Sequence, residues 1–181
     1  MFLIQLGHPK INTIPKQEFK TVREVFLRLF KSPEEGIFLF WNEIPVRFRY
    51  ARDLHDNFNE MLALVWLVQK ESKGATTVSF QNQILKMNLT VEWEMDRLTI
   101  QGDFEAFEFL YDSYATAMNR SSSLELSKKA FLCEWNTLFR QLITAIDASN
   151  CSIEDGIERR RIEVLAQTAN LIESYGRLYT R

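Results

Sequence analysis

The sequence predicts an α+β fold, in which a mostly antiparallel sheet of about four to six strands packs on helices and is followed by a C-terminal helical hairpin. Three observations support this class. Residues 87–104 alternate apolar and polar side chains with a period of two, as half-buried strands do. Residues 53–72 and 124–148 repeat apolar side chains at helical spacing. Only 6 Gly and 4 Pro occur, and this scarcity favours helices with short connections over a loop-rich sandwich.

The central prediction is a β-hairpin over residues 87–104 with one dry face and one acidic face. A two-residue turn at Asp96 and Arg97 would pair Trp93 with Ile100, and a slip of one residue would scatter the apolar side chains. A longer turn that keeps the same side chains on the same face is an alternative, because Asp-Arg lacks the glycine that tight turns favour. The dry face, which we expect to pack on the helix of residues 54–68, comprises Leu89, Val91, Trp93, Met95, Leu98, Ile100 and Phe104.

Shorter elements precede this hairpin. We expect a strand over residues 2–6 and a helix over 21–31 with Thr21 as its N-cap. A second hairpin is predicted over 36–50, with its turn at Asn42 and Glu43. One face of this hairpin is apolar, and the opposite face carries Phe38, Phe40, Arg47 and Arg49. We expect a terminal element to cover part of that mixed face, and an open ligand site is the alternative.

A long apolar helix follows, predicted from its N-cap Asp53 to Ser72 and closed by Lys73-Gly74. Because apolar residues surround most of its circumference, we expect it to be sandwiched between neighbours. A strand over residues 76–80 then leads into the central hairpin.

The remainder of the chain is predicted to be helical. We expect a turn between helices at residues 121–123, a helix over 124–148 and a last helix over 153–179. The first helical stripe of this part comprises Phe107, Leu110, Tyr111, Tyr114 and Met118. Short connections throughout indicate a single domain over residues 1–181, with a sheet-and-helix part over 1–104 and a helical part over 105–181.

Composition restricts the class of protein. A net charge of −2 argues against nucleic-acid binding, which normally requires a basic excess. The two cysteines, Cys133 and Cys151, are too few for a disulfide framework and are interpreted as reduced thiols. No apolar run approaches the roughly 20 residues of a membrane span, and the apolar start is too short for a signal peptide. These features predict a cytoplasmic protein without membrane contact.

The sequence contains no complete catalytic constellation. Its two histidines, His8 and His55, cannot supply the ligand sets of the usual zinc sites or of metal phosphohydrolases. Phosphate-binding glycine loops and the nucleophile elbow of hydrolases are missing from it. We therefore predict no catalytic residue, no cofactor and no metal ligand.

The strongest polar feature is a carboxylate cluster in and after the central hairpin. Its members are Glu92, Glu94, Asp96, Asp103, Glu105, Glu108 and Asp112, against Arg97 alone. The local charge is therefore −6 in a chain whose total is −2. Three interpretations remain: a solvated face, a docking surface for a basic partner, or a Mg²⁺ site made by Glu92, Glu94 and Asp103. Basic residues gather in the last predicted helix, at 159–161, 177 and 181, and are interpreted as a solvated surface.

The hairpin sequence VEWEMDRLTIQGDF, the small single domain and the clustered acids resemble bacterial immunity proteins of contact-dependent and polymorphic toxin systems. The resemblance implies a non-enzymatic protein that binds a toxin domain, here a basic one, and covers its active site. The expected partner-binding residues are Glu92, Glu94, Asp96, Asp103, Glu105 and Glu108. The alternatives are a metal-dependent hydrolase or nuclease that uses the hairpin carboxylates, and a structural subunit that oligomerises through its C-terminal helices.

Overall fold

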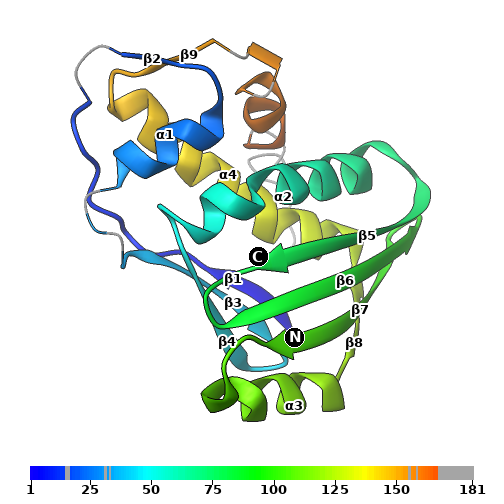
Figure 1. Cartoon of the computed structure of the whole chain (residues 1–181). Coiled ribbons are helices and arrows are strands. Elements are labelled where there is room, and N and C mark those ends of the chain that lie inside the picture. Colours follow the sequence, from blue (N-terminus) through cyan, green and yellow to red (C-terminus); the bar gives the residue numbers. More distant parts are fainter. Residues whose placement is uncertain (15–16, 31, 33, 155, 158, 167–181) are drawn as a thin grey trace, which may run out of the picture.

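The computed structural model describes residues 1–14, 17–30, 32, 34–154, 156–157 and 159–166. Helices and antiparallel sheets make up the molecule, which confirms the predicted α+β class (Figure 1). The strands are β1 (Phe2–Gln5), β2 (Glu18–Phe19), β3 (Gly36–Trp41), β4 (Ile44–Arg49), β5 (Lys73–Gln81), β6 (Leu85–Glu94), β7 (Arg97–Ala106), β8 (Ser123–Ser127) and β9 (Ser152–Ile153). The helices are α1 (Val22–Leu29), α2 (Asp53–Lys70), the 3₁₀ turn η1 (Phe109–Tyr111), α3 (Asp112–Arg120) and α4 (Lys128–Ala148).

The strands are divided between separate sheets instead of forming one. An antiparallel sheet has the order β5-β6-β7-β8, and a smaller antiparallel sheet has the order β1-β3-β4. A parallel pair joins β2 to β9. Residues 156–157 and 159–166 are helical, and the part of the predicted last helix beyond 166 lies outside the described residues, as do Arg177 and Arg181. Within the described part of the chain, no helix combines the length and the apolar character that crossing a bilayer requires.

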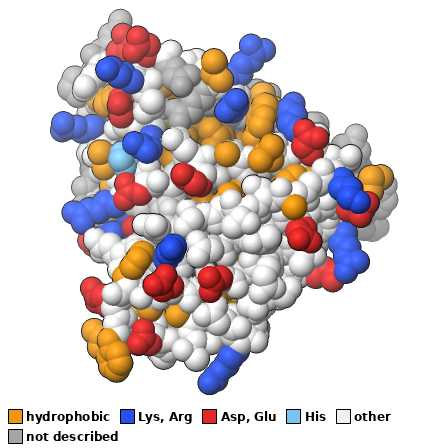
Figure 2. Space-filling view, turned by 45° about the vertical axis from the view of Figure 1, so that its right-hand side comes forward, with side chains coloured by type: hydrophobic (Ala, Val, Ile, Leu, Met, Phe, Trp, Pro, Cys, Tyr) orange, Lys and Arg blue, Asp and Glu red, His pale blue; other side chains and the backbone are white. Residues whose placement is uncertain are grey.

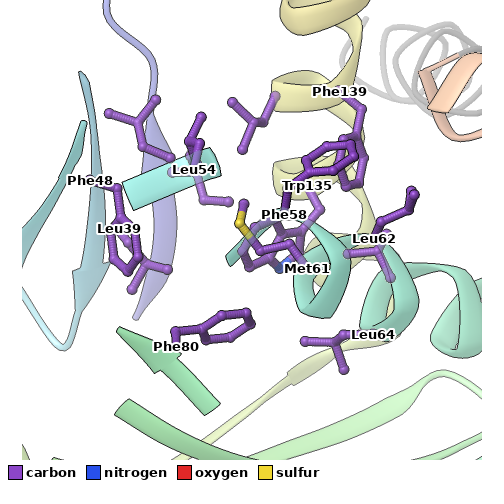
Figure 3. Close-up of a cluster of buried hydrophobic side chains, with 14 of the residues drawn as sticks. Leu39, Phe48, Leu54, Phe58, Met61, Leu62, Leu64, Phe80, Trp135 and Phe139 are labelled. Atoms are coloured by element: carbon purple, nitrogen blue, oxygen red, sulfur yellow. The ribbon is translucent and has the colours of Figure 1, made fainter. Parts of the chain in front are cut away.

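The core is built around α2, as the apolar circumference of this helix predicted (Figure 3). Phe58 of α2 is fully buried and meets Phe26 of α1 edge to face, with ring centroids 5.1 Å apart. Phe58 also meets Phe139 of α4 edge to face, with the two ring centroids 6.4 Å apart. Phe80 of β5 and Leu39 of β3 close the same cluster from the two sheets. One buried cluster therefore joins both sheets to the helices.

The hairpin β3–β4 has the predicted register. Trp41 pairs with Ile44, so the turn falls at Asn42 and Glu43, whose φ values of 46° and 73° are the positive values that such two-residue turns use. On the mixed face of this hairpin Arg49 is buried, and the predicted cover by a terminal element stays a prediction because residues 167–181 lie outside the described residues. Asn82, in the connection between β5 and β6, donates its amide to the carbonyl of Arg47 at 3.2 Å, while Phe38 on the same face is exposed.

Two predicted helix ends are wrong, for reasons of packing. Asp53 begins α2 but does not cap it, because its carboxylate accepts hydrogen bonds from the backbone and guanidinium of buried Arg49 at 2.8–3.2 Å. Gly74 does not close α2 and lies in β5 instead. The indole of Trp93 packs against this glycine so closely that a Cβ would come within 2.4 Å of the ring.

The central hairpin places the predicted side chains on each face, but every residue of β6 pairs with a residue of β7 two positions earlier than predicted. Glu94 pairs with Arg97 and Trp93 with Leu98, so the turn falls at Met95 and Asp96. The apolar face is otherwise buried as predicted, but Met95 is 74% exposed in the turn. The backbone carbonyl of Asp96 accepts the N–H of Lys128 at 2.7 Å, and this bond ties the turn to the start of α4.

The turn predicted at residues 121–123 is in part a strand. Leu124 and Leu126 pair with Ile100 and Leu98, so β8 completes the four-stranded sheet. The helix α4 consequently begins at Lys128, four residues later than predicted, and Ser127 caps it by accepting the N–H of Ala130 at 3.0 Å. Period-two alternation of leucines with Glu125 is the sequence signal for this strand.

Candidate protein-binding surface

The acidic residues of the central hairpin fall into two groups at opposite ends of the sheet. On the outer face, Glu92 lies opposite Thr99, whereas Asp103 lies four residues farther along β7. At about 3.3 Å per residue this separation is roughly 13 Å, too long for Glu92, Glu94 and Asp103 to share one cation. Among the residues that the structure describes, no group of three or more His, Cys, Asp or Glu side chains is placed to hold a metal.

The first group, at the hairpin turn, has cationic and backbone partners from other elements. Lys73 of β5 forms an ion pair with Glu94 at 2.8 Å. The carboxylate of Asp96 accepts the backbone N–H of Lys129 at 3.2 Å, and Arg97 pairs with Glu125 of β8 at 2.9 Å. Within this group Glu94 therefore has a cationic partner and Asp96 a backbone donor, whereas Arg97 pairs with an acid outside the group.

The second group, at the far end of β7, has a different environment. Glu105 lies 4.0 Å from Lys86, and further carboxylates follow at Glu108 and Asp112. Large apolar side chains are interleaved with these acids, and Phe109 and Leu110 are 88% and 78% exposed. Figure 2 shows hydrophobic and acidic side chains next to one another at the lower left of its view. We define the aromatic–acidic surface as Asp103, Glu105, Phe107, Glu108, Phe109, Leu110, Asp112 and Tyr114.

The backbone beneath this surface is held by specific hydrogen bonds. The strand β8 pairs with β7 only as far as Gln101, so Phe104 has no strand partner on that side. The side chain of Asn119 replaces the strand: its Oδ1 accepts the N–H of Phe104 at 3.0 Å and its Nδ2 donates to the carbonyl of Phe104 at 2.8 Å. Met118, next to Asn119 at the C-terminal end of α3, is fully buried, and the N–H of Phe107 before α3 donates to the carbonyl of Ile84 at 3.1 Å. The exposed apolar side chains therefore project from a fixed frame.

This surface corrects the predicted helical stripe over residues 107–118. Of the five predicted stripe residues only Met118 is buried, whereas Phe107, Leu110 and Tyr114 are exposed. A signal was present in the sequence: Phe109, Leu110 and Tyr111 are consecutive, and one helix face cannot hold three consecutive side chains. Sequence reasoning therefore found the acids of this surface and missed its apolar members.

The other candidate residues for chemistry lie apart from this surface and from one another. His55 is placed with its Nδ1 2.8 Å from a carboxylate oxygen of its neighbour Asp56. Cys151 is half-buried beside the hydroxyl of Ser149 at 3.1 Å, and Cys133 is half-buried in α4. In the basic segment, Arg159 pairs with Asp147 at 2.7 Å and with Glu163 at 2.8 Å.

Comparisons of the chain with protein-family models, with curated proteins and with solved structures gave no match. The assignment of a function therefore rests on the geometry and chemistry of the surfaces described above.

Proposed function

We propose that this protein is a non-enzymatic protein-binding module that acts as an immunity protein, neutralising a cognate toxin by covering its active site. The observation that supports the proposal is the aromatic–acidic surface, where Phe109 and Leu110 are almost fully exposed among carboxylates. Exposed apolar side chains that cluster on a folded protein are typical of interaction sites. The proposal uses Asp103, Glu105 and Glu108 of the six predicted partner-binding residues.

The two kinds of side chain would contribute to different steps of binding. Apolar side chains that enter a pocket of the partner supply most of the affinity, and about 2 kcal/mol or more is typically lost when such an anchor is truncated. The surrounding carboxylates attract a basic surface during diffusional encounter and raise the association rate. A basic toxin domain with an apolar recess near its active-site cleft fits both requirements.

The same arrangement disfavours a second copy of this chain as the partner at this surface. A two-fold contact there would place Glu105, Glu108 and Asp112 of the two copies against each other, and like charges at an interface are repulsive. Charge complementarity therefore favours a basic protein of different sequence.

A binding experiment can test the apolar part of this proposal. The probe is the polypeptide encoded directly upstream of this chain, because the gene of an immunity protein is expected to follow that of its toxin. Phe109→Ser combined with Leu110→Ser should weaken binding at least about 100-fold, mainly through faster dissociation, and should abolish protection of a bacterial host that expresses the toxin.

Met95→Ser is the matched control, because Met95 is also a highly exposed apolar residue but lies at the other end of the sheet. It should bind and protect as the unmodified protein does. The proposal fails if the upstream gene encodes no toxic polypeptide, or if the double variant binds and protects normally.

Two charge reversals separate the two acidic groups. Asp103→Lys with Glu105→Lys should slow association at low ionic strength, and added salt should remove most of the difference by screening. Glu92→Lys with Glu94→Lys makes the same change of charge at the hairpin turn and should alter the association rate much less. Equal effects of the two pairs would mean that the whole outer face of the sheet, and not its aromatic–acidic end, attracts the partner.

A further inference from the structure

A groove lies between α2 and the helical residues 156–157 and 159–166, and we call it the Trp66 groove. Its volume of about 610 Å³ is within the range of small-molecule sites, which is roughly 300–1,000 Å³. These helices lie at the opposite end of the molecule from α3, so the groove is separate from the aromatic–acidic surface (Figure 1). Its apolar lining is Trp66, Ile157 and Val164, and its charged lining is Glu154, Arg160 and Arg161.

The apolar wall of the groove is in contact with solvent. The chain has 4 Trp, of which Trp41, Trp93 and Trp135 are at most 4% exposed, whereas Trp66 is only half-buried. Ile157 on the same wall is 69% exposed. Folding therefore leaves two large apolar side chains on the wall of a hollow, and apolar walls with a few charged groups are typical of small-molecule sites.

The three consecutive arginines of this segment have different surroundings. Arg159 pairs with Asp147 at 2.7 Å and with Glu163 at 2.8 Å. Among the residues that the structure describes, no carboxylate is recorded as a partner of Arg160 or Arg161, and both arginines are exposed. The charges of these two arginines are therefore available to a ligand in the groove.

Further positive charge lies over the ring of Trp66. The ammonium nitrogen of Lys70 is 4.8 Å from the ring centroid and the guanidinium carbon of Arg161 is 5.6 Å from it, both within the distance of a cation–π contact. With Arg160, three cations face the single carboxylate of Glu154, which leaves a charge of +2 at the groove in a chain whose total is −2. The groove therefore favours an anion. Because cations already lie over the ring, an aliphatic chain suits this site better than a second aromatic ring.

A second hollow, of about 380 Å³ and with a polar lining, adjoins the groove, and Ile157 and Arg161 line both. Arg23 adds a cation to it. Its acid, Glu24, is used at the start of α1, where the carboxylate accepts the N–H of Lys20 at 3.0 Å. An apolar hollow and a cationic one therefore meet at Arg161.

We propose that the Trp66 groove binds a small amphipathic anion, an aliphatic carboxylate, whose chain lies on Trp66 and Ile157 and whose head binds Arg160 and Arg161. Guanidinium groups bind carboxylates through paired N–H donors, which gives both charge and geometry for the head. The hollow shape and its volume fit one free molecule and not the flat surface of a bilayer. The proposed toxin binding does not depend on this site.

Decanoate is the probe, because it joins one carboxylate to a flexible aliphatic chain. Calorimetry with the full chain should show saturable binding of decanoate below its micelle concentration. Since the other three tryptophans are buried, the tryptophan fluorescence should change saturably through Trp66, and Trp66→Phe should remove most of that change. Decanol, which has the same chain without the charge, should bind at least about tenfold more weakly because it forms no charge-assisted hydrogen bonds with the arginines.

The arginines provide matched variants. Arg160→Gln combined with Arg161→Gln should weaken decanoate binding at least about tenfold. Arg159→Gln is the control, because this arginine is adjacent in sequence but already paired with Asp147 and Glu163, and it should bind decanoate as the unmodified protein does. Circular dichroism should show that all variants are folded. The proposal is overturned if decanoate does not bind saturably, if decanol binds equally well, if the fluorescence change survives Trp66→Phe, or if the double variant binds as tightly as the Arg159→Gln control.

Discussion

The two ends of the outer face of the four-stranded sheet carry carboxylates in similar number but differ in their surroundings. At the hairpin turn, Glu94 pairs with Lys73 and Asp96 bonds to the start of α4. At the far end of β7, the acids surround exposed Phe109 and Leu110. The difference teaches that a local excess of acidic residues does not by itself define an interaction surface. The partners that other elements bring to the acids, and the apolar side chains between them, decide which end is available for binding.

The largest effect that separates the two ends is expected from truncation of their aromatic residues. Trp93 at the hairpin end is buried against Gly74 and donates its indole N–H to the carbonyl of Glu71 at 3.0 Å. Trp93→Ala should lower the free energy of unfolding by about 3–5 kcal/mol, as loss of a buried aromatic residue typically does. Urea denaturation followed by circular dichroism would measure this change.

Phe109→Ala is the control at the other end of the sheet. Because Phe109 is mostly in solvent, this substitution should change stability by no more than about 0.5 kcal/mol. Equal destabilisation by both substitutions would show that Phe109 is part of the core, and the comparison between the two ends would then fail.

A smaller effect is expected from the hydrogen bonds that hold α3 to β7. Asn119→Ala leaves both the N–H and the carbonyl of Phe104 without the amide that now bonds them, which should cost about 1–3 kcal/mol. Hydrogen exchange should show lower protection at Phe104 and in α3 than at the hairpin turn. Uniform loss of protection through the sheet would contradict a local role for Asn119.

The comparison also shows which structural features the sequence could predict. Period-two alternation correctly gave the buried face of the central hairpin, because Val91, Trp93 and Leu98 must share one face in any register of the same parity. It could not give the register, because a shift of two residues buries the same side chains. The position of the turn depends on the hydrogen bonds that Asp96 accepts from the start of α4. This part of α4 lies more than 30 residues away along the chain.

The candidate site was predicted in part, for a related reason. The acids were visible as a run in the sequence, but their division into two groups depends on strand register. Lys73, which balances Glu94, comes from a segment that was interpreted as the end of a helix. The exposure of Phe107 and Leu110 could not be read from a helical stripe, because α3 begins only at Asp112 and buries just its far end against β7.

The smallest effect concerns one carboxylate from each end. Asp96 accepts the N–H of Lys129 in the first turn of α4, where a negative charge also interacts favourably with the helix dipole. Asp96→Ala should therefore lower the free energy of unfolding by about 0.3–1 kcal/mol, and salt should reduce part of this difference. Asp103→Ala removes an equal charge from an exposed position at the other end and should change stability by less than about 0.5 kcal/mol in either direction. Thermal melts of both variants at low and high salt would compare them. If Asp103→Ala proved the more destabilising, the acids at the end of β7 would have a structural role, and their assignment to partner binding would lose its basis.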